Sequence, residues 1–192
     1  VDNPDDYTSA LEKHNVTYRL HIDGAYGGFV YPFSNQKSNI NFSNPKISSI
    51  TIDAHKMLQA PYGTGVFICR KGLIENVLTK EAEYVEGMDL TLCGSRSGAN
   101  AVAVWMILFT YGAYGWFEKV SVLQMRTQFL CNELDKLNIN YFREPFMNIV
   151  TIHAESIPER IAEKYDLVPQ QHNENNKWYK IVLMDHVEVE HL

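Results

Sequence analysis

Two short apolar segments of this chain each end in chemically distinctive polar side chains. The first is Tyr18–Asp23, which leads into the stretch GAYGG, and the second is Ser49–Asp53, which leads directly to Lys56. Their β-branched content predicts two buried strands. Side chains at the carboxyl ends of strands face the usual ligand crevice of an open α/β sheet. The sequence therefore predicts an α/β fold in which Asp23 and Lys56 emerge near each other, although they are distant in the chain.

The surrounding segments predict further elements of this first part. Asp2, Asn3 and Pro4 form a helix-start signal, and a helix is expected from there to about Lys13. The apolar segment Gly65–Arg70 predicts a buried strand. A short helix is expected over residues 72–78, and an irregular stretch over residues 81–92. Pro61 and Gly63 exclude a helix around Lys56, so a loop is expected there.

The second part of the chain has a different pattern. Residues 97–111 predict a long, apolar and buried helix, residues 112–115 a turn, and residues 116–137 a second long helix. Strand, helix and strand are then expected at residues 148–153, 158–165 and 179–184, with a polar hairpin or loop at 170–177. We therefore expect two domains, covering residues 1–115 and residues 116–192.

Composition excludes several classes of protein. The chain has 192 residues and a net charge of −6, with no basic stripe, which argues against nucleic-acid binding. No apolar run reaches the roughly 18 residues that a membrane span needs. The three cysteines, Cys69, Cys93 and Cys131, lack the spacing of a zinc site or a disulfide framework, so free thiols in a reducing cytoplasm are expected. The histidines show no metal-ligand spacing either.

An acid and a lysine in one crevice have two interpretations. They can form a salt bridge, which is the common structural case. They can also serve pyridoxal phosphate (PLP), which needs a lysine amine for a Schiff base and an acidic partner for its ring nitrogen. A carboxylate beside that nitrogen favours its protonated form. Ala25 and the glycines near Asp23 leave room for a flat ring, and His55 can bind a phosphate oxygen.

The chain resembles the group II PLP-dependent decarboxylases of fold type I. HIDGAYGG at residues 21–28 and SITIDAHK at residues 49–56 are similar to two motifs of that family, and LTLCGSRSGANA at residues 90–101 is similar to a third. EPFMNIVTIH at residues 144–153 and IVLMDHV at residues 181–187 resemble the C-terminal domain of the archaeal-type tyrosine/aspartate decarboxylases. The resemblance covers nearly the whole chain and implies part of the large PLP-binding domain, followed by a small α+β domain.

The resemblance also implies roles for single residues. Lys56 would form the internal aldimine, and Asp23 would pair with the pyridinium nitrogen. Ala25 would pack against the ring, and His55 would contact the phosphate. Asp53 would lie near that phosphate. Ser95, in the GSRSG loop, would reach the phosphate site of the neighbouring subunit, and Arg96 would either bind an anion or brace the loop.

Some features of the family pattern differ or lie outside this chain. Gly24 stands where alanine is commoner, which we expect to matter little, and Thr64 stands where Ala or Cys is usual. The residue that stacks on the ring and the main phosphate loop belong to the N-terminal half of the family. We therefore expect a C-terminal fragment whose partner is that half, in a cytoplasmic homodimer with the active site at the interface.

Three functions remain open at this point. The first is decarboxylation of an L-amino acid, with tyrosine expected first and aspartate or glutamate next, which would place the chain in carboxylic acid metabolism. The second is an aldehyde lyase of the sphingosine-phosphate-lyase type. The third is an inactive fragment or subunit.

Overall fold

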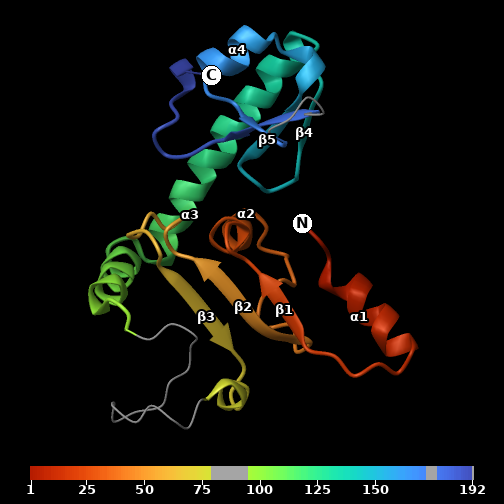
Figure 1. Ribbon diagram of the computed structural model, residues 1–192, viewed down its shortest axis with the longest axis vertical. Helices are drawn as coiled ribbons and strands as arrows, with labels where there is room; N and C mark the ends of the chain where they lie inside the picture. The colour runs from red at the N-terminus through yellow and green to blue at the C-terminus, as the bar shows by residue number, and fades with distance from the viewer. Residues whose placement is uncertain (79–94, 172–176, 192) are drawn as a thin grey trace. The chain divides into compact units, whose positions relative to one another are not determined.

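The computed structural model describes residues 1–78, 95–171 and 177–191, and these residues form two compact units (Figure 1). One unit comprises Val1–Pro32 and Gln36–Gly112, and the other comprises Phe33–Asn35 and Ala113–Leu192. The helices and strands follow in chain order: α1 (Pro4–Lys13), β1 (Leu20–Asp23), η1 (Gly27–Phe29), α2 (Tyr31–Ser34), β2 (Ile47–Asp53), β3 (Gly65–Cys69), η2 (Ile74–Val77), α3 (Gly98–Lys136), β4 (Tyr141–Arg143), β5 (Ile149–His153), η3 (Ala154–Ser156), α4 (Glu159–Lys164), β6 (Val168–Pro169), β7 (Trp178–Val182) and η4 (Val189–His191).

The first unit contains a three-stranded sheet in the order β1-β2-β3. β1 and β2 run parallel, and β2 and β3 run antiparallel. Because side chains alternate between the two faces of a strand, His21 and Asp23 share one face with Ser49, Thr51 and Asp53. The isoleucines between them, at positions 22, 50 and 52, point to the opposite face. On β1 and β2 one face is therefore polar and the other apolar, and the polar face carries both acids.

α1 confirms the predicted helix and its start signal. The side chain of Asn3 accepts a hydrogen bond from the backbone N–H of Asp5 at 3.2 Å, and Pro4 opens the first turn. The helix is tied to the segment before β2 by Lys46, whose Nζ lies 3.0 Å from Glu12 Oε2. This link holds α1 beside the entry to the strand that leads to Lys56.

Arg70 fixes the start of β2. Its Nε donates to the carbonyl of Ile47 at 2.6 Å, and its Nη2 donates to Asn44 O at 2.7 Å and to Phe42 O at 3.1 Å. The guanidinium also lies 5.5 Å from the centre of the Phe42 ring. One side chain at the end of β3 thus holds three carbonyl groups of the segment that enters β2.

β3 forms where the sequence predicts a strand, but the expectation that it is buried was wrong for this chain. Phe67 and Ile68 are 53% and 46% exposed. β3 lies at the edge of the sheet. Apolar residues predict that a strand forms, whereas its coverage depends on segments elsewhere that the strand's own sequence does not describe.

The two long helices predicted after residue 96 both form within the span α3, and a kink at Gly112 separates them. Gly112 has φ 57° and ψ −175°, a conformation that only glycine adopts readily. The residues of the expected turn that follow it are helical. The expectation of a buried first half was wrong for this chain, since Trp105 and Phe109 are 60% and 76% exposed. Their apolar character marks a surface that the described residues leave uncovered.

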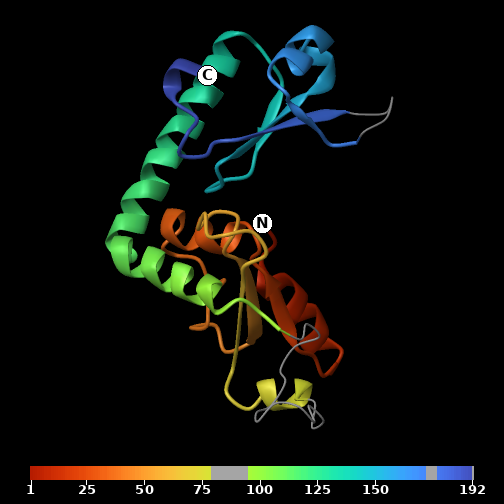
Figure 2. The ribbon, with the colours of Figure 1, turned by 60° about the vertical axis from the view of Figure 1, so that its left-hand side comes forward.

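The second unit is an antiparallel sheet in the order β4-β5-β7-β6, packed against the second half of α3 (Figure 2). The predicted strand, helix and strand correspond to β5, α4 and β7, while β4 and β6 were not predicted. Both unpredicted strands are three residues or shorter, too short for a period-2 pattern to be visible. The core is built by Leu130, Cys131, Leu134, Val150, Ile152 and Leu183.

Asn148 joins the two central strands of this second sheet. Its side chain is fully buried and donates to the carbonyl of Leu183 at 2.8 Å, while Leu183 N–H donates to Asn148 O at 2.9 Å. Elsewhere, none of the described helices has the length and apolar character needed to cross a membrane. Within residues 1–78, 95–171 and 177–191, no three His, Cys, Asp or Glu side chains gather as metal ligands.

Candidate active site

The candidate site is built on the adjacent carboxyl ends of β1 and β2. Asp23 is the last residue of β1 and is paired in register with Thr51, two residues before the end of β2. The strands stay joined beyond this point, because Gly24 N–H donates to Thr51 O at 2.8 Å and Asp53 N–H donates to Ala25 O at 3.0 Å. The loops that carry Asp23 and Lys56 therefore leave the sheet side by side.

Gly24 allows this close approach of the two loops. A Cβ atom at this position would lie 3.0 Å from Thr51 O and 3.2 Å from Gly28 Cα, both backbone atoms. We expected this departure from the family pattern to matter little. In this structure an alanine here requires the backbone to move by a few tenths of an ångström.

Lys56 lies on a turn that buried neighbours and a backbone hydrogen bond hold in place. Its neighbours Ala54, Met57 and Leu58 are all buried, and Lys56 N–H donates to Asp53 O at 3.1 Å. The Lys56 side chain is 41% exposed, and its Nζ lies 2.9 Å from Asp53 Oδ2. The backbone of the lysine is thus fixed while its amine stays accessible, as a nucleophile requires.

The acid that contacts Lys56 is Asp53, whereas the sequence suggested a salt bridge between Lys56 and Asp23. The ion pair of Lys56 is with Asp53, a residue expected near a phosphate. Asp23 Oδ1 instead accepts a hydrogen bond from the N–H of Ala25 at 3.0 Å. The simple salt bridge between Asp23 and Lys56 is not among the contacts of the described residues. Asp53 as the partner of Lys56 could have been anticipated, because the two side chains are three positions apart on one turn.

His55 has a defined tautomer in this arrangement. Its Nδ1 lies 2.9 Å from the carbonyl oxygen of Thr64, which can only accept, so Nδ1 carries the proton. Nε2 faces the other way and lies 4.0 Å from Asp53 Oδ2. In the neutral ring Nε2 has no proton, so His55 can donate to an anion through Nε2 only as an imidazolium.

Ser95, the remaining predicted site residue, is not brought to this cluster by any described contact. It is exposed and lies just before α3, together with Arg96. Gly94 and the segment 81–92 lie outside the described residues. The predicted action of Ser95 on a neighbouring subunit stays a prediction.

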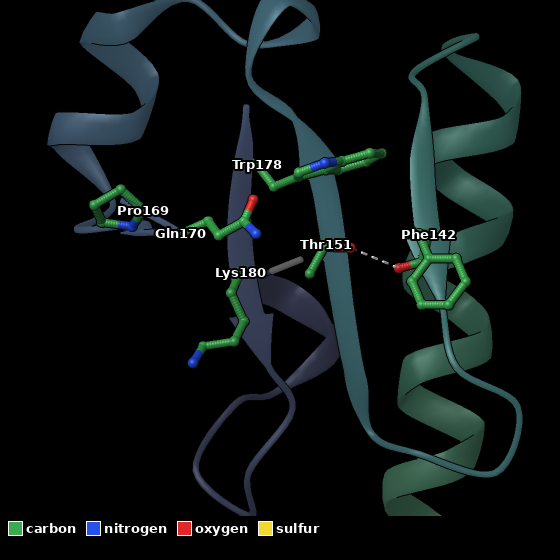
Figure 3. A pocket seen from close by; sticks show the side chains of 6 residues that line it. All are labelled: Phe142, Thr151, Pro169, Gln170, Trp178 and Lys180. Atoms are coloured by element: carbon green, nitrogen blue, oxygen red, sulfur yellow. Dashed lines mark hydrogen bonds between the residues drawn. The ribbon is translucent and has the colours of Figure 1, made fainter. Parts of the chain in front are cut away.

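A separate pocket of about 470 Å³ lies on the exposed face of the second sheet (Figure 3). Its walls include Phe142 and Trp178, and the Lys180 side chain supplies a cation. Thr151, which pairs with Lys180 across the strands, donates to the carbonyl of Phe142 at 3.2 Å. Aromatic walls beside one ammonium suit a ligand with a planar apolar part and an anionic group. Sequence reasoning missed this pocket because its residues come from four strands, two of which were not predicted.

Solved structures with the same fold define the class of protein. A sphingosine-1-phosphate lyase from Burkholderia pseudomallei has a TM-score of 0.77 at 18% identity, covering 96% of this chain and 44% of the lyase. A glutamate decarboxylase from Lactobacillus brevis has a TM-score of 0.75 at 20% identity, over 95% of this chain and 46% of that enzyme. The chain therefore has the architecture of the fold type I PLP enzymes.

The sequence comparisons narrow this class to one family. Residues 1–149 match the pyridoxal-dependent decarboxylase conserved domain, so the chain belongs to the pyridoxal-dependent decarboxylases. It is 56% identical to a tryptophan decarboxylase from Clostridium sporogenes over 99% of this chain and 46% of that enzyme. It is 36% identical to a probable L-tyrosine/L-aspartate decarboxylase from Methanocella arvoryzae, over 85% of this chain and 44% of that protein. The chain thus spans about half the length of these curated relatives.

Proposed function

We propose that the full-length protein decarboxylates an aromatic L-amino acid and that Lys56 holds its PLP cofactor. The observation that carries this proposal is the exposed amine of Lys56 on an anchored turn, beside the strand end that presents Asp23. The aromatic substrate is supported by the 56% identity to a tryptophan decarboxylase. Tryptophan was not among the substrates expected from the sequence, which were tyrosine first and then aspartate or glutamate.

The chemistry of the described residues fits this cofactor. Lys56 offers an accessible amine, Asp23 offers an exposed carboxylate, and Gly24 lets the loop after Asp23 lie close to the backbone of β2. When bound, pyridoxal phosphate supplies an electron sink for the pair left at the substrate's α-carbon. Lys56 would bind it covalently, and Ala25, next to Asp23, would contact its ring.

Each polar residue of the site has a task in this proposal. The Asp23 carboxylate, oriented by the N–H of Ala25, would hold a proton on the ring nitrogen. His55 would contact a phosphate oxygen through Nε2, the ring nitrogen that faces away from Thr64 O. Asp53 would also orient the Lys56 amine through the 2.9 Å ion pair. Ser95 would act on the phosphate bound by a neighbouring subunit.

The experiment that tests this function is a product analysis. The full-length protein with added PLP is incubated with tryptophan, tyrosine, aspartate and glutamate, and both CO₂ and the amine are measured. We expect the highest kcat/KM with tryptophan or tyrosine. Release of an aldehyde from a phosphorylated long-chain base, without CO₂ from any amino acid, would instead support the aldehyde-lyase alternative. The observation behind this alternative is the similar fold of the Burkholderia pseudomallei lyase, at 18% identity.

The wider setting of the enzyme is also part of the proposal. The described cysteines, Cys69 and Cys131, are free thiols, as is usual in the cytoplasm. A homodimer follows from the resemblance to fold type I enzymes. The inactive-fragment alternative is tested by scanning absorbance from 330 to 430 nm after adding PLP to the 192-residue chain and to the full-length protein. A cofactor band that appears in the full-length protein but not in the 192-residue chain would show that the chain needs the N-terminal half to bind the cofactor.

A further inference from the structure

His21, the first residue of the motif HIDGAYGG, has no role in the site described so far. It lies on β1, two residues before Asp23, and the register of β1 and β2 places its side chain on the same face as Asp23. Within this motif, the resemblance to the decarboxylases assigns roles only to Asp23 and Ala25. The contacts of His21 are nevertheless specific.

The imidazole of His21 is held at both nitrogens by side chains of β2. Nδ1 lies 2.8 Å from Ser49 Oγ, and Nε2 lies 3.2 Å from Thr51 Oγ1. The ring also stacks on Phe67 of β3, with 6.1 Å between ring centres and 25° between the planes. Hydroxyl groups both donate and accept, so they satisfy the protonated and the bare nitrogen of a neutral ring together. The ring is therefore fixed in position and in plane.

This clamp lies where the pairing of β1 and β2 is irregular. The register between the two strands shifts between Leu20 and His21, and regular pairing resumes at His21. β1 has only four residues, so few backbone hydrogen bonds define the direction in which it ends. Thr51, which bonds His21, is also the register partner of Asp23. The clamp thus joins His21 to the residue directly beside the candidate acid.

We propose that His21 is a positioning residue that holds the carboxylate of Asp23 in line with the cofactor ring, acting through Thr51. This inference rests on the proposed function, because it assigns Asp23 to the ring nitrogen. A network of this kind fixes the orientation of a functional group without touching the substrate. Its loss should change the chemical step more than substrate binding.

The test uses full-length holoenzyme and four variants. His21→Phe keeps a ring for stacking on Phe67 but removes both hydrogen bonds, whereas His21→Gln keeps an amide that can reach Thr51. Thr51→Val removes the link from the other side, and His14→Phe makes the same change at an exposed histidine beyond α1 as the control. We measure kcat, KM and the absorbance of the bound cofactor, together with thermal unfolding.

Each outcome decides the inference. We expect His21→Phe and Thr51→Val each to lower kcat about tenfold, with little change in KM and a shifted cofactor absorbance. His21→Gln should recover most of the kcat, and the double variant should be no worse than either single variant. Wild-type kcat and absorbance in His21→Phe would overturn the proposed role of His21. It would also be overturned if the two losses of kcat multiplied in the double variant of His21→Phe and Thr51→Val. If His21→Phe does not fold, wild-type kcat and absorbance in Thr51→Val would overturn it. Retained cofactor attachment in Lys56→Ala would refute the proposed function itself, independently of His21.

Discussion

Arg70→Lys tests how the fold supports the candidate site. Arg70 donates three hydrogen bonds to the carbonyls of Phe42, Asn44 and Ile47, at 2.6 to 3.1 Å, from a partly buried position. Lysine carries one positive nitrogen on a flexible stem and cannot reproduce the planar fork of the guanidinium. A hydrogen bond from a charged donor contributes about 1.5 to 3 kcal/mol, so losing two of the three should cost about 3 to 6 kcal/mol locally.

Hydrogen exchange of the β2 amides measures this loss directly. Since about 1.4 kcal/mol corresponds to a factor of ten, protection of Ile47–Asp53 should fall by roughly 100-fold or more in Arg70→Lys. Cofactor binding should weaken in parallel, because β2 leads to Lys56. Arg19→Lys is the matched control, since the hydrogen bond from Arg19 Nη1 to Tyr18 O is long, at 3.4 Å, and exposed. Equal protection of β2 in the two variants would refute the role of Arg70.

Three further predictions follow from other contacts. Asp53→Asn should change the free energy of unfolding by less than about 1 kcal/mol, because the ion pair is partly exposed, but it should slow cofactor attachment in stopped-flow absorbance; an unchanged attachment rate would contradict the role of Asp53. Gly112→Ala should destabilise α3 by about 1 to 3 kcal/mol in urea unfolding, because its φ of 57° with ψ −175° strains any side chain; an unchanged midpoint would show that the backbone relaxes. Burial, the neighbouring Cys131 and the Asp135 carboxylate raise the pKa of Tyr141 to about 12. The unfolded tyrosine loses its proton near pH 10, so the stability that Tyr141 contributes below pH 10 should be lost as the pH rises from 10 to about 12. Tyr141→Phe should remove both this loss and the last phase of an absorbance titration of the tyrosines.

The positions of the strand ends could be predicted from sequence, because local patterns determine them. Apolar β-branched runs followed by polar residues located Asp23 at the end of β1 and Lys56 on the turn after β2, and the capping side chain of Asn3 located the start of α1. The partner of Lys56 was not predicted, although Asp53 lies only three positions away from it. Asp23 and Asp53 are chemically equivalent in sequence, and the local turn brings only Asp53 to within 2.9 Å of the amine.

The exposure of apolar residues and the pocket on the second sheet could not be predicted, because both depend on distant segments. The apolar residues of β3 and of the first half of α3 indicated burial, but what covers Phe67 or Trp105 is not encoded in those segments themselves. Lys180 gives no local signal for a pocket, since Phe142 and Trp178 approach it only through the pairing of β4, β5 and β7. Roles of single residues came from the family resemblance, whereas the His21 clamp came from the side-chain contacts.

Mapping of a trapped adduct identifies the lysine that holds the cofactor. The full-length protein is saturated with pyridoxal phosphate, reduced with borohydride, digested and examined by mass spectrometry. The phosphopyridoxyl mass should appear on the peptide that contains Lys56, should persist in Lys71→Ala and should be absent in Lys56→Ala. A label on another lysine, or one that persists in Lys56→Ala, would contradict the account.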